Sequence, residues 1–192
     1  MKIGSGVVAL ALCVLTAGQP LHASEWVSDA RRSTLAFVGV YQGDAFNGRF
    51  GQFIARITFD PARLAASRFD VQITLASADT ANSERDAMLK GAEFFDATRI
   101  PIARYTSTRF RSLGDNRYLA EGVLSLRGIS KPVPLQFSWT PSAMPTLTGD
   151  ATINRLDFDI GGGQWKDTGV IGTQVKVHAA LKLLPRNSAP AH

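Results

Sequence analysis

The chain has 192 residues, and its 21 lysines and arginines exceed its 16 aspartates and glutamates to give a formal net charge of +5 at pH 7. The basic residues are scattered along the sequence instead of forming a block or an aromatic-interleaved stripe, so we predict that the protein binds no nucleic acid. Its single cysteine, Cys13, lies in an N-terminal apolar run, which leaves the rest of the chain without disulfide or thiolate chemistry.

The N-terminus has the pattern of a secretory signal peptide. Lys2 precedes an uncharged apolar run at residues 7–17, and the sequence becomes polar at Ser24. The run is shorter than the roughly 20 residues that a membrane-spanning helix needs. We therefore predict a signal peptide at 1–23, one domain at 24–185 and a polar tail at 186–192. Secretion by this route would place the protein in the periplasm.

Alternating apolar and polar side chains predict strands in the first part of the domain. These strands are expected at residues 26–27, 35–41, 50–59 and 69–75. Gly43-Asp44 and Asn47-Gly48 have turn chemistry and predict a turn or loop before the third strand. Asp60-Pro61 ends that strand, because proline has no N–H to give to a β-ladder.

The periodicity changes at residues 82–95, where we predict the helix of the domain. Asn82 or Ser83 can cap its N-terminus, and acidic side chains in the first turn suit the positive end of the helix dipole. Gly91 is expected to stop the helix.

Strands return in the second half of the domain, and a long hairpin is its most regular feature. Residues 118–126 and 133–139 alternate well and are joined by residues 127–132, which have turn chemistry. The other predicted segments are a strand at 102–110, a strand or bent pair at 147–160, a flexible triple glycine at 161–163 and a last strand at 173–184.

About eight strands with short turns and one short helix predict an all-β fold, an eight-stranded antiparallel barrel. A barrel of about this size has an interior that side chains can fill or that can hold one small ligand. The apolar faces are consistent with either a solid core or a core with a tunnel, and periodicity does not separate the two.

Residues able to carry catalysis are scarce. His178 is the one histidine inside the predicted domain, and it lies on the polar face of the last strand. With no cysteine beside it, the sequence speaks against a hydrolytic triad and against a zinc or copper site. We therefore predict a protein that is not an enzyme, with no catalytic residues and no metal.

The remaining polar candidates have two interpretations each. Asp157 and Asp159 share a face of a predicted strand and could pair for acid–base work, although two surface aspartates are the default. Arg155 is either a buried anchor for a polar head group or an outward-facing strand residue. Arg85 and Asp86 could bond to each other or cap neighbouring strands, a structural role that is favoured over a catalytic one.

Several short motifs follow one another in a definite order along the domain. They are Ser33-Thr34-Leu35-Ala36-Phe37, Gly48-Arg49-Phe50-Gly51-Gln52-Phe53, Phe59-Asp60, Arg85-Asp86, Phe94-Phe95-Asp96, Gly122-Val123-Leu124-Ser125-Leu126-Arg127-Gly128 and Asn154-Arg155-Leu156-Asp157-Phe158. Their order and spacing resemble those of the YceI-like, polyisoprenoid-binding periplasmic proteins, over nearly the whole domain.

The resemblance implies a lipocalin-like, eight-stranded antiparallel barrel with a helix near one end. It also implies that an isoprenoid chain, in one version with a quinone-type head, lies in the barrel, and some relatives are associated with b-type membrane cytochromes. Members often have a histidine at the end of the strand at 35–41. This chain has Tyr41-Gln42 there, so a role for that histidine does not carry over.

These observations predict a periplasmic binding or carrier protein that holds an isoprenoid-type lipid, polyprenyl or quinone-like, and needs no other cofactor. The residues expected to line the tunnel are Leu35, Phe37, Tyr41, Phe53, Ile57, Val71, Ile73, Leu124, Leu135, Phe137, Ile153, Phe158 and Val177. Tyr41, Arg155 and Trp165 are expected at the head-group end.

Two alternatives remain open at this point. The barrel could be an accessory docking protein for a quinone-linked membrane cytochrome b system. It could instead be an enzyme acting on a lipid, which the scarcity of histidine and cysteine disfavours. Separately from these alternatives, the protein could form a homodimer.

Overall fold

The computed structural model describes residues 24–186, so the predicted signal peptide and residues 187–192 lie outside the described part. The strands are β1 (Glu25–Ser28), β2 (Thr34–Tyr41), β3 (Asp44–Phe50), β4 (Phe53–Thr58), β5 (Arg68–Thr74), β6 (Ala78–Asp79), β7 (Ile102–Gly114), β8 (Arg117–Leu126), β9 (Ile129–Thr140), β10 (Thr146–Asn154) and β11 (Gln174–Pro185). The helices are α1 (Ser83–Lys90) and the 3₁₀ turns η1 (Leu64–Ala66), η2 (Leu75–Ser77), η3 (Arg155–Phe158) and η4 (Gly163–Trp165).

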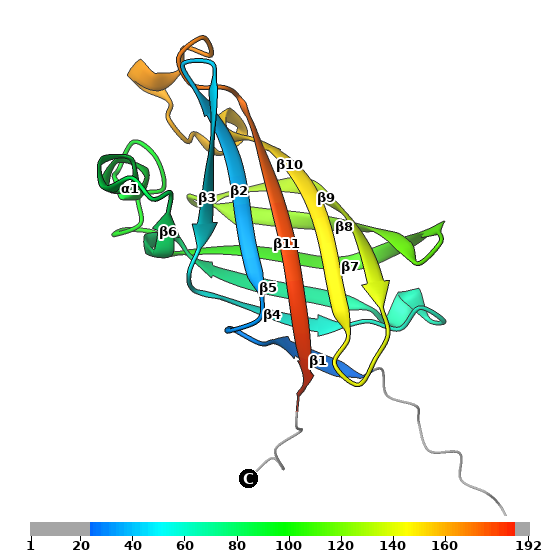
Figure 1. Ribbon diagram of the computed structural model, residues 1–192. Coiled ribbons are helices and arrows are strands. Elements are labelled where there is room, and N and C mark those ends of the chain that lie inside the picture. The colour runs from blue at the N-terminus through cyan, green and yellow to red at the C-terminus, as the bar shows by residue number, and fades with distance from the viewer. Residues whose placement is uncertain (1–23, 187–192) are drawn as a thin grey trace, which may run out of the picture.

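The strands form one antiparallel sheet that closes on itself. β1 pairs with β4 on one side and with β11 on the other, which closes the ring β1-β4-β5-β7-β8-β9-β10-β11. β2 continues along the edge of β11 beyond β1, β3 pairs with β2, and β6 pairs with β3. Three positions in the ring are therefore each occupied by two strands that follow one another in the sequence: β1 and β2, β3 and β4, and β5 and β6. The ring has eight positions in all (Figure 1). The predicted eight-stranded antiparallel barrel with one helix is confirmed.

Aromatic side chains fill one end of the barrel. Phe59 is central to this closed end, with its ring centroid 4.9 Å from that of Tyr118, 5.2 Å from that of Phe137 and 5.1 Å from that of Trp139. Phe69 packs against Phe137 at 5.1 Å. Edge-to-face ring pairs stabilise a fold by more than the burial of their area alone. Because these rings fill this end of the barrel, we call it the aromatic floor.

The long hairpin exists, but its turn is shorter than predicted. Leu126 pairs with Ile129, and only Arg127 and Gly128 lie between them, both with positive φ (56° and 77°). This is the backbone of a two-residue type I′ turn. Pro132 belongs to β9, in a stretch that pairs with β8 but not with β10, so its missing N–H leaves no ladder bond unmade.

The predicted loop at Asn47-Gly48 is wrong. The turn is confined to Gln42-Gly43, and Asn47 and Gly48 lie within β3. Gly48 pairs with Phe37, whose ring covers it so closely that a Cβ on Gly48 would stand 2.2 Å from the ring. The glycine is therefore there for packing and does not make a turn.

The predicted strand at 147–160 ends early. β10 stops at Asn154, whose side-chain oxygen accepts a hydrogen bond from the Leu156 N–H and starts η3. Asp157 and Asp159 therefore do not share a strand face, and the acid–base pairing is not formed. Gly161 in the triple glycine is buried, and its N–H donates to the Glu93 carbonyl, so it is not a free connection.

Helix α1 begins and ends as its sequence predicts, although it is shorter than the predicted segment. The Asn82 side chain accepts from the Arg85 N–H, and Gly91 follows the last turn. Residues 91–101 continue as turns that lead into β7. Among residues 24–186, no helix is long and apolar enough to cross a membrane.

Candidate functional site

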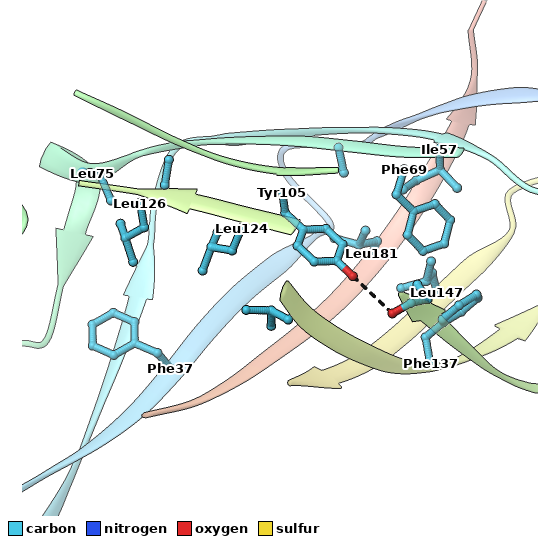
Figure 2. Close-up of a cluster of buried hydrophobic side chains, with 14 of the residues drawn as sticks. Phe37, Ile57, Phe69, Leu75, Tyr105, Leu124, Leu126, Phe137, Leu147 and Leu181 are labelled. Atoms are coloured by element: carbon cyan, nitrogen blue, oxygen red, sulfur yellow. Dashed lines mark hydrogen bonds between the residues drawn. The ribbon is translucent and has the colours of Figure 1, made fainter. Parts of the chain in front are cut away.

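A cavity of about 380 Å³ lies inside the barrel between the floor and the end that carries α1. Its wall is almost wholly apolar, because the inward positions of β2, β4, β5 and β7 to β11 carry aliphatic and aromatic side chains. Its size is within the range of small-molecule sites, about 300–1,000 Å³. Figure 2 shows Phe37, Leu124 and Leu126 on one side of Tyr105, with Phe69 and Leu147 on the other.

Most of the predicted tunnel residues lie on this wall. Those that do are Leu35, Phe37, Tyr41, Phe53, Ile57, Val71, Ile73, Leu124, Leu135, Ile153, Arg155 and Val177. Contact of these residues with a ligand stays a prediction.

Three predicted residues do not lie on the cavity wall. Phe137 belongs to the aromatic floor, Phe158 is buried at the end of η3, and neither lines the cavity. Trp165 lies outside the wall on η4, where its indole N–H donates to Glu93 Oε2 at 2.6 Å and its ring packs 6.0 Å from that of Phe94. Its N–H is thus taken by another rim residue.

Tyr105 is a buried polar side chain on the cavity wall. Its hydroxyl donates a long hydrogen bond, 3.4 Å, to the Ala120 carbonyl, and burial raises the pKa of Tyr105, so the hydroxyl stays neutral. Its ring crosses Gly122, where a Cβ would stand 2.1 Å from the ring. Gly122 therefore allows the Tyr105 ring to lie against the neighbouring strand β8.

We expect Gly122→Ala to destabilise the protein by about 1–3 kcal/mol, because the new methyl group displaces the Tyr105 ring in a packed interior. Chemical denaturation of the single variants and of Tyr105→Leu/Gly122→Ala measures this. Tyr105→Leu should remove much of the clash, so the double variant should be more stable than the sum of the two single costs predicts. Strictly additive costs would contradict this packing.

The open end of the cavity is lined by residues that flank the β2–β3 turn, by α1 and by the segment between β10 and β11. Arg85 is its most notable polar group and one that the sequence interpretation missed. The guanidinium lies 4.5 Å from the Phe46 ring centroid, Nε donates to Thr80 Oγ1 at 2.9 Å, and Nη2 donates to the Thr80 carbonyl at 3.3 Å. Asp86 accepts from the Thr80 N–H and hydroxyl at 2.8 and 2.7 Å, which fixes Thr80 beneath Arg85.

Arg155 is 2% exposed, and its guanidinium is wholly engaged by backbone. Nε donates to the Gly172 carbonyl, Nη1 to those of Ile160 and Gly161, and Nη2 to those of Trp165 and Ile171, at 2.6–3.0 Å. An arginine has five N–H donors, so none is left for a head group. Burial lowers the pKa of Arg155, although a guanidinium stays charged in proteins. Neither of the two interpretations from sequence describes this role, which is to shape the rim.

A second arginine holds the adjoining part of the rim. Arg127 Nη1 donates to the carbonyls of Ala92 and Phe94, and Nη2 pairs with Asp159 at 3.2 Å. The turn of the β8–β9 hairpin is thereby tied to the segment after α1.

Groups suited to catalysis are not gathered at the cavity. In the described part of the chain, no three His, Cys, Asp or Glu residues are placed to hold a metal ion. His178 is exposed on the outer face of β11, with Nδ1 2.7 Å from Asp150 Oδ1. The apolar wall is suited to binding an apolar molecule.

Comparisons with known proteins agree on one domain type. The model of the YceI-like domain matches residues 26–183. Two UPF0312 proteins, from Pseudomonas putida strain W619 and Pseudomonas savastanoi pv. phaseolicola, are 31% and 29% identical over 173 residues, which cover 84% of this chain and 89% of each relative.

Two solved structures have the same barrel. BcnA of Burkholderia cenocepacia superposes with a TM-score of 0.77 at 28% identity, covering 80% of this chain and 98% of that one. A polyisoprenoid-binding domain from Saccharophagus degradans superposes with a TM-score of 0.66 at 18% identity, covering 85% and 99%, which is a likeness of fold.

Proposed function

Since the chain belongs to the YceI-like family, whose domain model matches residues 26–183, we propose that it is a periplasmic binding or carrier protein for an isoprenoid-type lipid. The lipid chain lies in the barrel cavity, with its end towards the aromatic floor and its head at the open end.

The observation that carries this proposal is an apolar cavity that is closed at one end and open at the other. An apolar chain that leaves water gains about 25 cal/mol for each Å² it buries, so the wall needs no reactive group to bind a lipid. The structure of similar fold from Saccharophagus degradans is named as a polyisoprenoid-binding domain, which supports the same ligand class here.

Several parts of the proposal rest on sequence. The periplasmic location follows from the predicted signal peptide. A binding role without catalysis follows from the family and from the wall chemistry. Association with a membrane cytochrome b and homodimer formation stay predictions.

Calorimetric titration of lipid-free protein with farnesol, a C15 isoprenoid alcohol, tests the binding proposal. We expect saturable binding with a negative heat-capacity change, the mark of apolar burial. Prenol, the C5 alcohol of the same series, should bind at least about a hundredfold more weakly, because each buried CH₂ contributes about 0.8 kcal/mol and prenol has ten fewer carbons to bury. No saturable heat with farnesol, or equal affinity for both alcohols, would contradict the proposal.

A further inference from the structure

Arg85 lies where two spaces meet. It lines the barrel cavity, and it also lines a groove on the outside of β2 and β3. Tyr41 and Phe46 are likewise shared by both. The groove is more polar than the cavity, and its wall includes Thr34, Gln42, Asn47, Arg49, Asp79 and Thr80. An amphiphile with its chain in the cavity would have its head group at this junction.

No carboxylate within residues 24–186 pairs directly with Arg85, and the nearest link to one is through the Thr80 hydroxyl, which bonds both Arg85 Nε and Asp86. Among the described residues, its guanidinium bonds only to Thr80, and none of their ion pairs includes it. Glu84 also lines the open end but is exposed and does not pair with Arg85. In the described part of the chain, Nη1 of Arg85 has no hydrogen-bond partner, although the side chain is half-buried.

The other two arginines that line these spaces, Arg49 and Arg155, already bond to groups of the protein. Arg49 in the groove donates to Asp79 from both Nε and Nη2, at 3.1 and 2.8 Å. Arg155 on the cavity wall gives every donor to backbone carbonyls. Arg85 is therefore the cation of this junction whose charge is open to a ligand.

We propose that Arg85 forms an anion-binding subsite at the open end and that the bound lipid carries an anionic oxygen head, a phosphate or a carboxylate. The Phe46 ring and the Thr80–Asp86 pair position the guanidinium, and the Nη1 donors meet the head group. A guanidinium suits such anions because its fork of N–H groups matches their oxygens. This inference rests on the proposed function and specifies the ligand class of the same site.

Three probes with the same C15 chain test the subsite: farnesol, farnesyl phosphate and farnesoic acid. Their affinities for the unaltered protein are measured by calorimetry at low salt. The same titrations are repeated with Arg85→Gln, Arg85→Lys and the control Lys90→Gln. Lys90 is on the same helix but lines neither the cavity nor the groove. Lys90→Gln removes one positive charge from the same helix, so it shows whether a preference for anions comes from Arg85 itself or from the overall positive charge of the region.

For the unaltered protein we expect at least one anionic probe to bind about tenfold more tightly than farnesol, the gain from a charged hydrogen bond. The preferred anion then identifies the head. Arg85→Gln should lower the affinity for the preferred anion to that for farnesol, Arg85→Lys should keep part of the preference, and Lys90→Gln should keep all of it.

Each other outcome overturns the inference. Equal binding of all three probes shows that no anion subsite exists, while the lipid-binding proposal stands. If Arg85→Gln weakens the binding of farnesol and of the anionic probes by the same factor, Arg85 only supports the cavity. A matching loss of preference in Lys90→Gln shows a diffuse field. Failure of all three probes to bind counts against the proposed function itself.

Discussion

Arg155→Met is expected to lower the free energy of unfolding by about 3–5 kcal/mol, because it strips hydrogen bonds from buried carbonyls of the rim. Methionine replaces much of the volume of arginine but offers no donor. The five carbonyls that Arg155 now binds would be left unsatisfied or would draw water into the rim. For a domain of this size, the loss corresponds to a fall of the melting temperature on the order of 10 °C.

Two further variants make this result specific. Arg155→Lys keeps the charge but has only three donors, so its stability should fall between those of the unaltered protein and Arg155→Met. Arg111→Met, which removes an exposed pair with Glu121, should change the melting temperature far less. Equal melting temperatures for Arg155→Met and Arg111→Met would show that the rim does not depend on Arg155.

Ala151→Trp is expected to weaken farnesol binding at least about a hundredfold while the barrel stays folded, because an indole ring placed in the cavity takes the space and the apolar wall that the ligand needs. Ala151 lies on the inward face of β10, opposite Val177 of β11, and lines the cavity. Calorimetric titration with farnesol, together with thermal unfolding, measures both effects.

The control for this variant lies one residue away. Thr152 is exposed on the outer face of the same strand, so Thr152→Trp adds the same ring without entering the cavity and should keep farnesol affinity. Should Ala151→Trp unfold the protein, Ala179→Phe blocks the cavity from β11 instead. Undiminished binding by a folded, blocked variant would place the ligand outside the barrel.

The barrel could be predicted from sequence because the alternation of apolar and polar residues is a local property of each strand. Val133 and Trp139 on β9 are buried, whereas Gln136 and Ser138 between them are exposed, as the pattern predicts. Closure follows from the apolar face of so many consecutive strands. The role of a glycine was harder to predict. Gly48 has turn chemistry, but in the structure it leaves room for the Phe37 ring to pack against β3.

The site was harder to predict, because alternation tells which side chains point inward but not how far along the barrel they lie. Phe137 points inward as expected, yet its height places it in the floor. Arg155 lies where β10 gives way to η3, so strand periodicity could not say which way it points. Arg85 was visible within a motif, but its role at the open end depends on contacts with Phe46 of β3 and with Thr80, which no local pattern shows.

The most direct test of the account is organic extraction of the protein purified from its native host, followed by mass spectrometry of the extract. A barrel built to hold a lipid should yield an isoprenoid-type lipid in stoichiometric amount, and the Ala151→Trp protein prepared in parallel should yield almost none. Native protein that releases no such lipid, or releases as much when its cavity is blocked, would contradict the account.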